Sequence, residues 1–454
     1  MASRREPNAR LRALLAEAGW TSQDLARAVN ATGAESGLVL TYDRTSVAHW
    51  LAGSRPPEPV ARVVAETLAR RLRRRVEPND AALTRPSRDA PTRAVPEREE
   101  DIDIVAHLVE LAGSGPGRRA ALTSLVYSIG AAALPEFSGA VPLRAAPERW
   151  SDARDTLARA QSAELMLDLF AASDAESGGG LARPALSAYL AADVAPALRR
   201  DVRTAADRRL TRAAARLAYL AGYMSFDENL GGAAQAYYRT AARLFARAGD
   251  LSGYTTTLRA LSIQAHHLGH HAHARDLAEA AAGHLPALPT GQGALLSGQL
   301  AVTAAATGDR RAALTHLSRA HRLLDHGQDA HGQDAHGTIG AFHPAALAHQ
   351  EAEVLAAGAD RTGAIAALTA SLRHRPPGER RARALTTAQL AELQLDQGRL
   401  EQACATWHVF LDDRRHLHSA RADDALARLR ARLRPHRHQA AARILLDRTQ
   451  SDRA

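Results

Sequence analysis

The sequence contains no lysine, because all 58 of its Lys and Arg positions are arginine. A phosphate-binding loop of the Walker type needs a lysine, so nucleotide hydrolysis through such a loop is excluded. The single cysteine, Cys404, excludes an intramolecular disulfide and a cysteine-based zinc site. One cysteine without a partner is typical of a reducing compartment, so we expect a cytoplasmic protein.

Aromatic residues and long apolar runs are also scarce. Aromatics make up 4% of the 454 residues, and the longest apolar stretch, residues 120–134, is too short and too interrupted to cross a bilayer. The N-terminus lacks the apolar segment of a secretion signal. An alanine-rich chain of this length with few aromatics favours several all-α domains over β-sandwiches, and we expect no membrane partner.

Catalytic motifs are missing as well. Neither G-x-S-x-G nor H-E-x-x-H occurs, and no glycine-rich loop follows an expected strand. We therefore expect a protein that is not an enzyme and needs no cofactor.

Positive charge is concentrated near the N-terminus. The first 75 residues hold 13 arginines and 7 acidic residues, which accounts for most of the formal net charge of +9. An excess of this kind favours a polyanionic partner.

The same segment has the pattern of four short helices. Residues 8–18 carry apolar side chains at helical spacing and end at Gly19, and the second helix opens with Thr21 as its cap. The third begins at Asp43 and runs through Ala52, and the fourth covers residues 58–73 and ends in an arginine cluster.

The third helix has two different faces. Val47, Trp50 and Leu51 share an apolar face, which predicts a core role for the tryptophan. The outward face carries polar side chains, namely Arg44, Thr45, Ser46 and His49. A helix with such a face suits the DNA major groove, where side chains of this kind read base edges.

The segments TSQDLARAV and DRTSVAHWLAGSRPPEP carry a resemblance. Together they resemble the phage-repressor-like helix-turn-helix family, which implies double-stranded DNA as partner. The resemblance implies that Gln23 contacts backbone phosphate and that Arg55 is a flanking phosphate contact. It further implies contacts to bases or neighbouring phosphates from the outward face, by Arg44, Thr45, Ser46 and His49.

The connection before the third helix departs from that family. Residues 31–42 place a dozen residues where a tight turn is usual, which leaves the angle between the two helices open. The alternative interpretation is a generic four-helix module whose arginines only keep it soluble.

From about residue 205 the chain repeats a glycine-containing turn followed by a small residue. The alanines that mark the repeats are spaced by 40, 39, 51 and 39 positions, and they are Ala234, Ala274, Ala313, Ala364 and Ala403. The long interval contains HGQDAHGQDAHG, residues 326–337, which we interpret as a loop insertion. Small residues at these positions let paired helices approach closely, so each unit is expected to be a helical hairpin. Residues 205–435 resemble tetratricopeptide repeats in five degenerate copies.

The whole layout resembles a class of actinobacterial regulators that join a helix-turn-helix to such repeats. We expect the following parts: residues 1–83, the DNA-binding domain; 84–100, a linker; 101–204, a helical bridge with helices at 101–112, 118–134, 147–172 and 183–200; 205–435, the repeats; and 436–454, a C-terminal helix and tail. The resemblance implies a transcription regulator, with some members restraining sporulation and antibiotic production. We expect a homodimer whose repeat groove binds a protein or peptide. The alternative is a repeat scaffold without DNA binding.

A run of histidines in residues 266–273 is the strongest metal-site candidate. Gly269 interrupts the run, and no carboxylate or cysteine lies within it. We therefore expect a solvated turn between helices and no bound metal.

Overall fold

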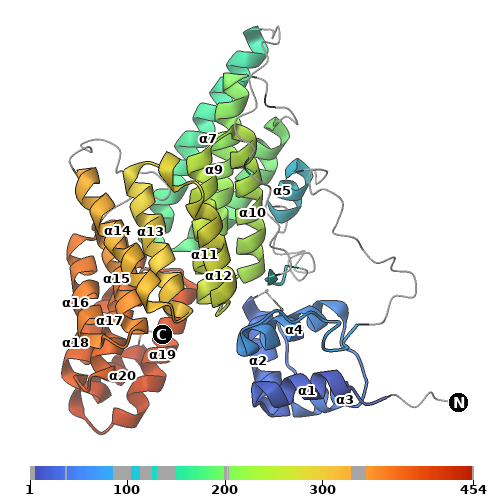
Figure 1. Ribbon diagram of the computed structural model, residues 1–454, viewed down its shortest axis with the longest axis vertical. Helices are drawn as coiled ribbons and strands as arrows, with labels where there is room; N and C mark the ends of the chain where they lie inside the picture. Colours follow the sequence, from blue (N-terminus) through green and yellow to red (C-terminus); the bar gives the residue numbers. More distant parts are fainter. Residues whose placement is uncertain are drawn as a thin grey trace, which may run out of the picture.

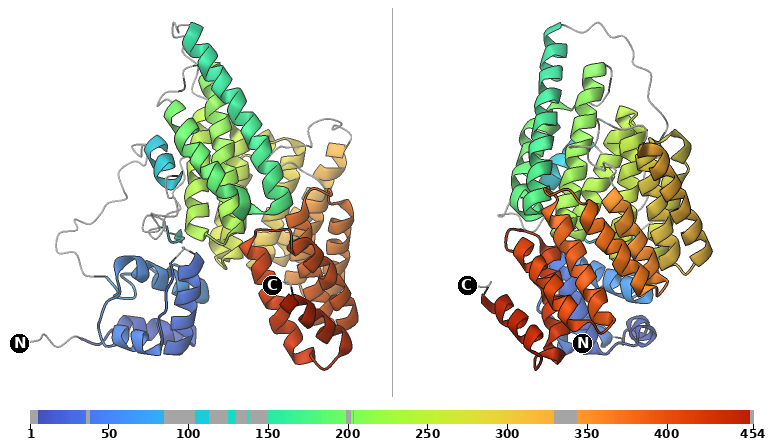
Figure 2. Two further views of the ribbon diagram at one scale, coloured as in Figure 1. Left: turned by 180° about the vertical axis from the view of Figure 1, so that it is seen from behind. Right: turned by 90° about the vertical axis from the view of Figure 1, so that its left-hand side faces the viewer.

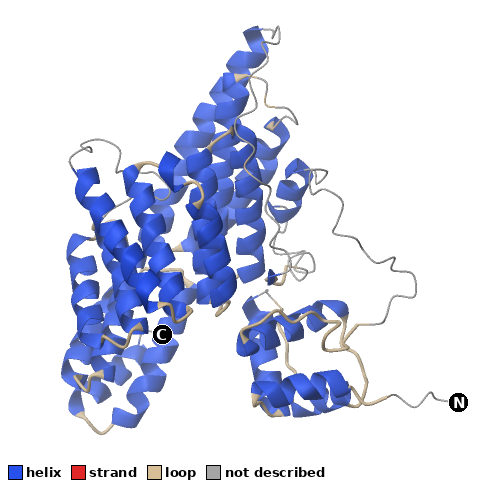
Figure 3. Ribbon diagram, viewed as in Figure 1, coloured by secondary structure: helices blue, strands red, loops and turns tan. Residues whose placement is uncertain are grey.

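The computed structural model describes residues 6–35, 38–84, 104–112, 125–129, 137, 150–198, 202, 204–328 and 344–451. All regular secondary structure in these ranges is helical, and they contain no strand (Figure 3). The predicted all-α fold is confirmed. No helix in the described parts of the chain is long and apolar enough to span a membrane.

The N-terminal module, residues 6–84, packs four helices around a core of its own. They are α1 (Ala9–Ala18), α2 (Ser22–Glu35), α3 (Arg44–Leu51) and α4 (Glu58–Leu72). The predicted caps are in use: Gly19 ends α1 with a φ of 64°, and Thr21 and Asp24 exchange hydrogen bonds of 3.1 and 3.2 Å where α2 begins. Trp50 is 4% exposed and lies edge-on to the ring of Tyr42, so its predicted core position is confirmed.

The connection between α2 and α3 is shorter than predicted. Residues 31–42 were expected to form a loop, but α2 continues through Glu35 because Thr32 on its last turns is buried in the module. Asn30 then fixes the rest of the connection. Its side chain donates a hydrogen bond of 2.8 Å to the carbonyl of Tyr42 and accepts one of 2.9 Å from the N–H of the same residue. A side chain of α2 therefore holds the backbone just before α3 in place.

The bridge to the repeats differs in part from the prediction. It contains α5 (Ile104–Ala112), α7 (Trp150–Ser177) and α8 (Gly179–Tyr189), followed by a π-helical turn (Leu190–Val194) and a 3-10 turn (Ala195–Ala197). A helix over residues 118–134 is wrong for residues 125–128, which are not helical, and most of its remainder lies outside the described residues. Tyr127 is buried and its neighbours in residues 125–129 are half-buried, and an apolar run alone does not distinguish an extended segment of this kind from a helix.

The rest of the chain is a series of helical hairpins (Figure 1). The pairs are α9 (Ala205–Asp227) with α10 (Gly231–Ala248), α11 (Leu251–His267) with α12 (His271–Ala282), α13 (Thr290–Ala306) with α14 (Arg310–Gln328), α15 (Pro344–Ala357) with α16 (Arg361–His374), α17 (Arg380–Asp396) with α18 (Leu400–Arg414), and α19 (Ala420–Leu433) with α20 (Ala440–Ser451). A 3-10 turn (Leu285–Ala287) follows α12, and another (Arg434–His436) lies between α19 and α20.

The alanines that mark the repeats are buried where the paired helices meet, so the predicted hairpins are confirmed. In the first pair, a Cβ added to Gly222 would lie 2.8 Å from the ring of Tyr238, which shows how closely α9 and α10 approach. A sixth pair, α19 with α20, extends the array beyond residue 435.

Two predicted connections fall largely on residues that the structure does not describe. Only Thr84 of the expected linker at residues 84–100 is described. Of the expected insertion at residues 326–337, the first three residues end α14 and the others lie outside the described residues.

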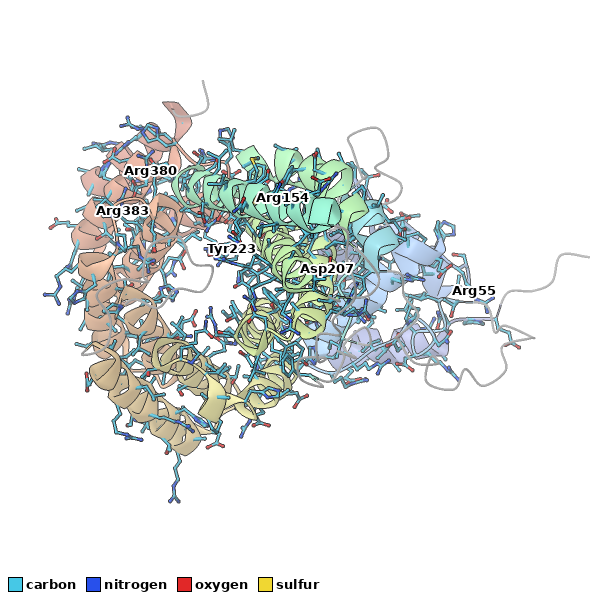
Figure 4. The ribbon with its side chains drawn as sticks, turned by 90° about the horizontal axis from the view of Figure 1, so that it is seen from above. Arg55, Arg154, Asp207, Tyr223, Arg380 and Arg383 are labelled. Carbon is cyan, nitrogen blue, oxygen red and sulfur yellow. The ribbon has the colours of Figure 1, made fainter. Side chains whose placement is uncertain are left out.

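The array of hairpins bends until its last members meet the bridge (Figures 2 and 4). Arg381 at the start of α17 forms an ion pair of 2.5 Å with Asp174 of α7, and both side chains are buried. The guanidinium of Arg381 also lies 4.5 Å from the ring centroid of Tyr223 on α9. Asp227, at the end of α9, accepts hydrogen bonds from the N–H of Gly179 (2.9 Å) and the hydroxyl of Ser419 (2.8 Å). The array is therefore closed by buried polar contacts and not left as an open superhelix.

Candidate nucleic-acid interface

Helix α3 lies on the side of the N-terminal module that faces away from the repeats, whereas α4 lies on the side towards them (Figures 1 and 2). Val47 and Trp50 bury one face of α3 in the module core, as predicted. Arg44, Thr45 and His49 are exposed on the other face. The sequence therefore placed these three residues on the correct side of the helix.

Ser46 has a structural task that the sequence analysis did not assign. Its backbone N–H and its hydroxyl each donate a hydrogen bond of 2.8 Å to Asp43, which caps α3. These bonds, together with one from Thr45, lower the pKa of the Asp43 carboxyl. The N-terminus of α3 is thus capped by a carboxylate next to Arg44, and this carboxylate already occupies the amide of Ser46.

Two expected phosphate contacts flank this face. Gln23 is exposed in the first turn of α2, beside the cap formed by Thr21 and Asp24. Arg55 is exposed in the turn after α3 and lies at the far edge of the module from the repeats (Figure 4). Within the described residues, Arg44 and Arg55 form no ion pair.

The arginine cluster at the end of α4 is engaged within the protein. Arg70 pairs with Glu66 and Glu35 at 2.7 Å each, and Arg74 pairs with Glu17 at 2.6 Å. Arg71 donates to the carbonyl of Ala18, Arg75 pairs with Glu77 at 2.7 Å, and these contacts hold the end of α4 to α1 and to the following turn. These four side chains are therefore engaged by carboxylates and a carbonyl of the module itself, although Arg74 and Arg75 stay largely exposed.

The far face of α4 is buried against the repeats by a contact that the sequence analysis missed. Glu66 accepts a hydrogen bond of 2.8 Å at Oε1 from Nε2 of His270, and the two side chains are 4% and 1% exposed. The ring of Tyr127 stacks on His270 with centroids 5.3 Å apart. The only sequence signal was an acidic residue within the apolar stretch of the helix, between Val63 and Ala69.

The histidine run was expected to be a solvated turn, which is wrong for His270. Gly269 does form the turn between α11 and α12, with a φ of 86°, but His270 is buried because α4 covers it. Among the described residues, no group of three or more His, Cys, Asp or Glu side chains is arranged to hold a metal ion.

Residues 125–129 fill the space between the module and the repeats. Val126 packs against the module core, and Tyr127 is 3% exposed. Gln235 of α10 accepts from the N–H of Ser128 at 3.1 Å and donates to its carbonyl at 2.9 Å. This segment therefore connects the module to α10 by apolar contacts on one side and by backbone hydrogen bonds on the other.

Residues 11–84 match the family described as the SP15 N-terminal domain. The match covers the four helices of the module and the turn that closes its core at Leu83. No curated protein matches the chain.

Proposed function

We propose that the protein is a sequence-specific DNA-binding transcription regulator that reads a duplex through α3. The observation that supports this most directly is the exposed face of α3, with Arg44 and His49 turned outward above a buried Val47 and Trp50. A short helix held rigidly on a small module is what a major groove accepts.

The sequence resemblances extend this proposal. The N-terminal module resembles phage-repressor-like helix-turn-helix domains, and the hairpins resemble tetratricopeptide repeats. By its resemblance to actinobacterial regulators with this layout, we propose that the protein controls differentiation or secondary metabolism. In this proposal the repeats bind a protein or peptide partner, form a homodimer, or both.

An apolar surface on α7 supports the homodimer. Leu165 and Leu169 lie one helical turn apart and are 72% and 62% exposed. Two exposed leucines on one face are suited to the same face of a second copy, as in an isologous interface. Dimerisation would provide the second reading helix that such modules need to bind two half-sites.

A second candidate function is a protein-interaction scaffold without DNA binding. It is favoured by the engagement of Arg70, Arg71, Arg74 and Arg75 within the protein, which leaves fewer arginines for phosphates than the composition indicated. The acidic cap Asp43 beside the outward face of α3 also favours it.

The two functions are separated by selecting bound sequences from a random duplex pool with the full-length protein. A regulator enriches one motif, whereas a scaffold enriches none. On the enriched site, Arg44→Ala or His49→Ala should cost about 1 to 3 kcal/mol in binding free energy if either residue contacts a base. Arg55→Ala should weaken binding to all DNA sequences similarly. It should also reduce the number of counterions released on DNA binding, which sets the salt dependence of the affinity, by about one.

Matched controls lie on the repeats. Arg319 and His438 are exposed there, and Arg319→Ala or His438→Ala removes the same chemical group far from α3. If Arg44→Ala and Arg319→Ala weaken DNA binding equally, α3 is not the helix that reads the bases.

A further inference from the structure

Helix α7 carries a stripe of exposed side chains on a face that is not packed against α8 or α9. The stripe consists of Arg154, Leu157, Gln161, Leu165 and Asp168. Seen from behind, α7 lies in front of the neighbouring helices, and its N-terminal end projects beyond them (Figures 1 and 2). The stripe is therefore accessible to a partner along its whole length.

The order of residues in this stripe is symmetric about its centre. The spacings are three, four, four and three positions, which keep all five side chains on one side of a helix. On either side of Gln161 a leucine follows after four positions, and a charged residue follows three positions further on. The charge is positive at one end and negative at the other. The stripe is thus symmetric in its apolar residues and opposite in its charges.

The two charges at the ends of the stripe are not used within the described parts of the chain. Arg154 and Asp168 are both exposed, and neither forms an ion pair with a described residue. Glu164, at the edge of the stripe, is by contrast paired with Arg209 of α9 at 2.6 Å. The charges of α7 that reach α9 are therefore engaged, whereas those of the stripe point to solvent.

The two leucines of the stripe are also open to solvent. Leu157 is 38% exposed and Leu165 is 72% exposed, although each belongs to a residue type that is usually buried. Leu169, one turn after Leu165, is 62% exposed and extends the apolar surface. Apolar side chains flanked by charges of both signs are typical of an interaction surface.

From this pattern we propose that two copies of the protein associate through α7, with the two helices antiparallel about a twofold axis at Gln161. Leu157 of each copy then lies opposite Leu165 of the other, and Arg154 lies opposite Asp168. A parallel pair would place each of these charged residues opposite the same residue of the second copy, where like charges repel. The charges therefore select the antiparallel arrangement, and a second copy supplies the complementary stripe automatically.

The interface is short, and this sets the expected affinity. Two helices paired over about four turns bury less surface than the roughly 1,200–2,000 Å² of a stable complex. We therefore expect a reversible dimer with a dissociation constant on the order of micromolar. The exposed ion pairs at its ends fix the orientation of the helices more than they add to the affinity.

The test is analytical ultracentrifugation of full-length protein without DNA, from submicromolar to high micromolar concentration. We expect the parent to associate reversibly into a dimer. Arg154→Glu and Asp168→Arg should each weaken this association about tenfold or more, because each places like charges opposite each other at both ends of the interface. An equimolar mixture of the two variants should associate like the parent, since the mixed dimer again has opposite charges at both ends.

A control for a general charge effect lies on the same helix. Arg159 is exposed but lies outside the stripe, so Arg159→Glu should leave the association unchanged. If Arg159→Glu weakens the dimer as much as Arg154→Glu does, the proposed pairing is wrong.

The homodimer belongs to the proposed function, and the inference rests on it in that respect, whereas no residue of α3 takes part in the pairing. A parent that stays monomeric would overturn both the pairing and the homodimer, and would leave the reading of DNA by α3 untouched. A dimer that the two variants do not weaken would overturn the pairing of α7 alone. The same holds for a mixture that associates no better than either variant by itself.

Discussion

The attachment of the N-terminal module to the repeats makes a sharp prediction at two adjacent glycines. Gly231 and Gly232 both lie in the first turn of α10, where it meets residues 125–129. A Cβ added to Gly232 would lie 1.5 Å from the carbonyl oxygen of Leu125 and 2.2 Å from its carbon. A Cβ added to Gly231 would meet nothing closer than 3.7 Å. Gly232→Ala should therefore displace the segment, and Gly231→Ala should not.

The cost follows from what the displacement breaks. Cβ contacts shorter than 3.0 Å are essentially never observed, so the Leu125 carbonyl must retreat by about 1.5 Å. A shift of this size disrupts both hydrogen bonds between Gln235 and Ser128, each worth about 0.5 to 1.5 kcal/mol. It also partly exposes the buried Tyr127 ring, which costs about 1 to 2 kcal/mol for incomplete loss of burial. Because alanine favours the helix by about 1 kcal/mol, the net loss for Gly232→Ala is about 1 to 4 kcal/mol.

Hydrogen exchange measures this directly on the full-length protein. In Gly232→Ala the amides of residues 125–129 should exchange about fivefold to a thousandfold faster than in the parent, since each factor of ten corresponds to about 1.4 kcal/mol. Gly231→Ala should exchange like the parent. Equal exchange in the two variants would refute the assignment of this segment as the connection between module and repeats.

Three further perturbations follow from buried or half-buried groups. Trp50→Ala should destabilise the module by about 3 to 5 kcal/mol, and an unchanged melting temperature in calorimetry would contradict its core position. Arg381→Met leaves Asp174 buried without its cation and should lower the free energy of unfolding by about 3 to 5 kcal/mol. The double variant Asp174→Asn/Arg381→Met should lower it less, because no charge is left unpaired. Urea denaturation measures both variants, and equal losses would argue against a charge effect. Burial, aided by nearby arginines, lowers the pKa of His349 to about 4, so the native state resists protonation there and loses stability as the pH falls from about 6.5 towards 4. His349→Gln should therefore lose less stability than the parent between pH 7 and pH 4.5 in urea titrations, and parallel curves would exclude this histidine as a source of acid sensitivity.

Local structure was predictable wherever a local signal decides it. Four features depend on residues within a few positions of each other. They are the glycine after α1, the caps at Thr21 and Asp43, and the buried face of α3 with Trp50. The hairpins were predictable for a similar reason, since each copy of the repeat buries its small residue against the helix beside it in the sequence. The outward position of Arg44, Thr45 and His49 followed from the same periodicity.

The apolar segment around Tyr127 shows where that reasoning reaches its limit. Its composition predicted a helix, which is wrong for residues 125–128, because the choice between helix and extended chain depended on what surrounds the segment. The hydrogen-bond partner of its backbone is Gln235, 107 positions away from Ser128.

The sequence by itself therefore determined the helices, their buried faces and the repetition of hairpins. Only the tertiary structure decided which polar groups meet. Glu66 and His270 are 204 positions apart, and Asp174 and Arg381 are 207 apart. In the sequence, each of these four looks like an ordinary polar surface residue. A buried charge is tolerated only if a partner elsewhere in the fold compensates for its lost hydration. No local sequence pattern specifies that partner. The same holds for the arginines at the end of α4, because the carboxylates and the carbonyl that engage them become neighbours only when the module has folded.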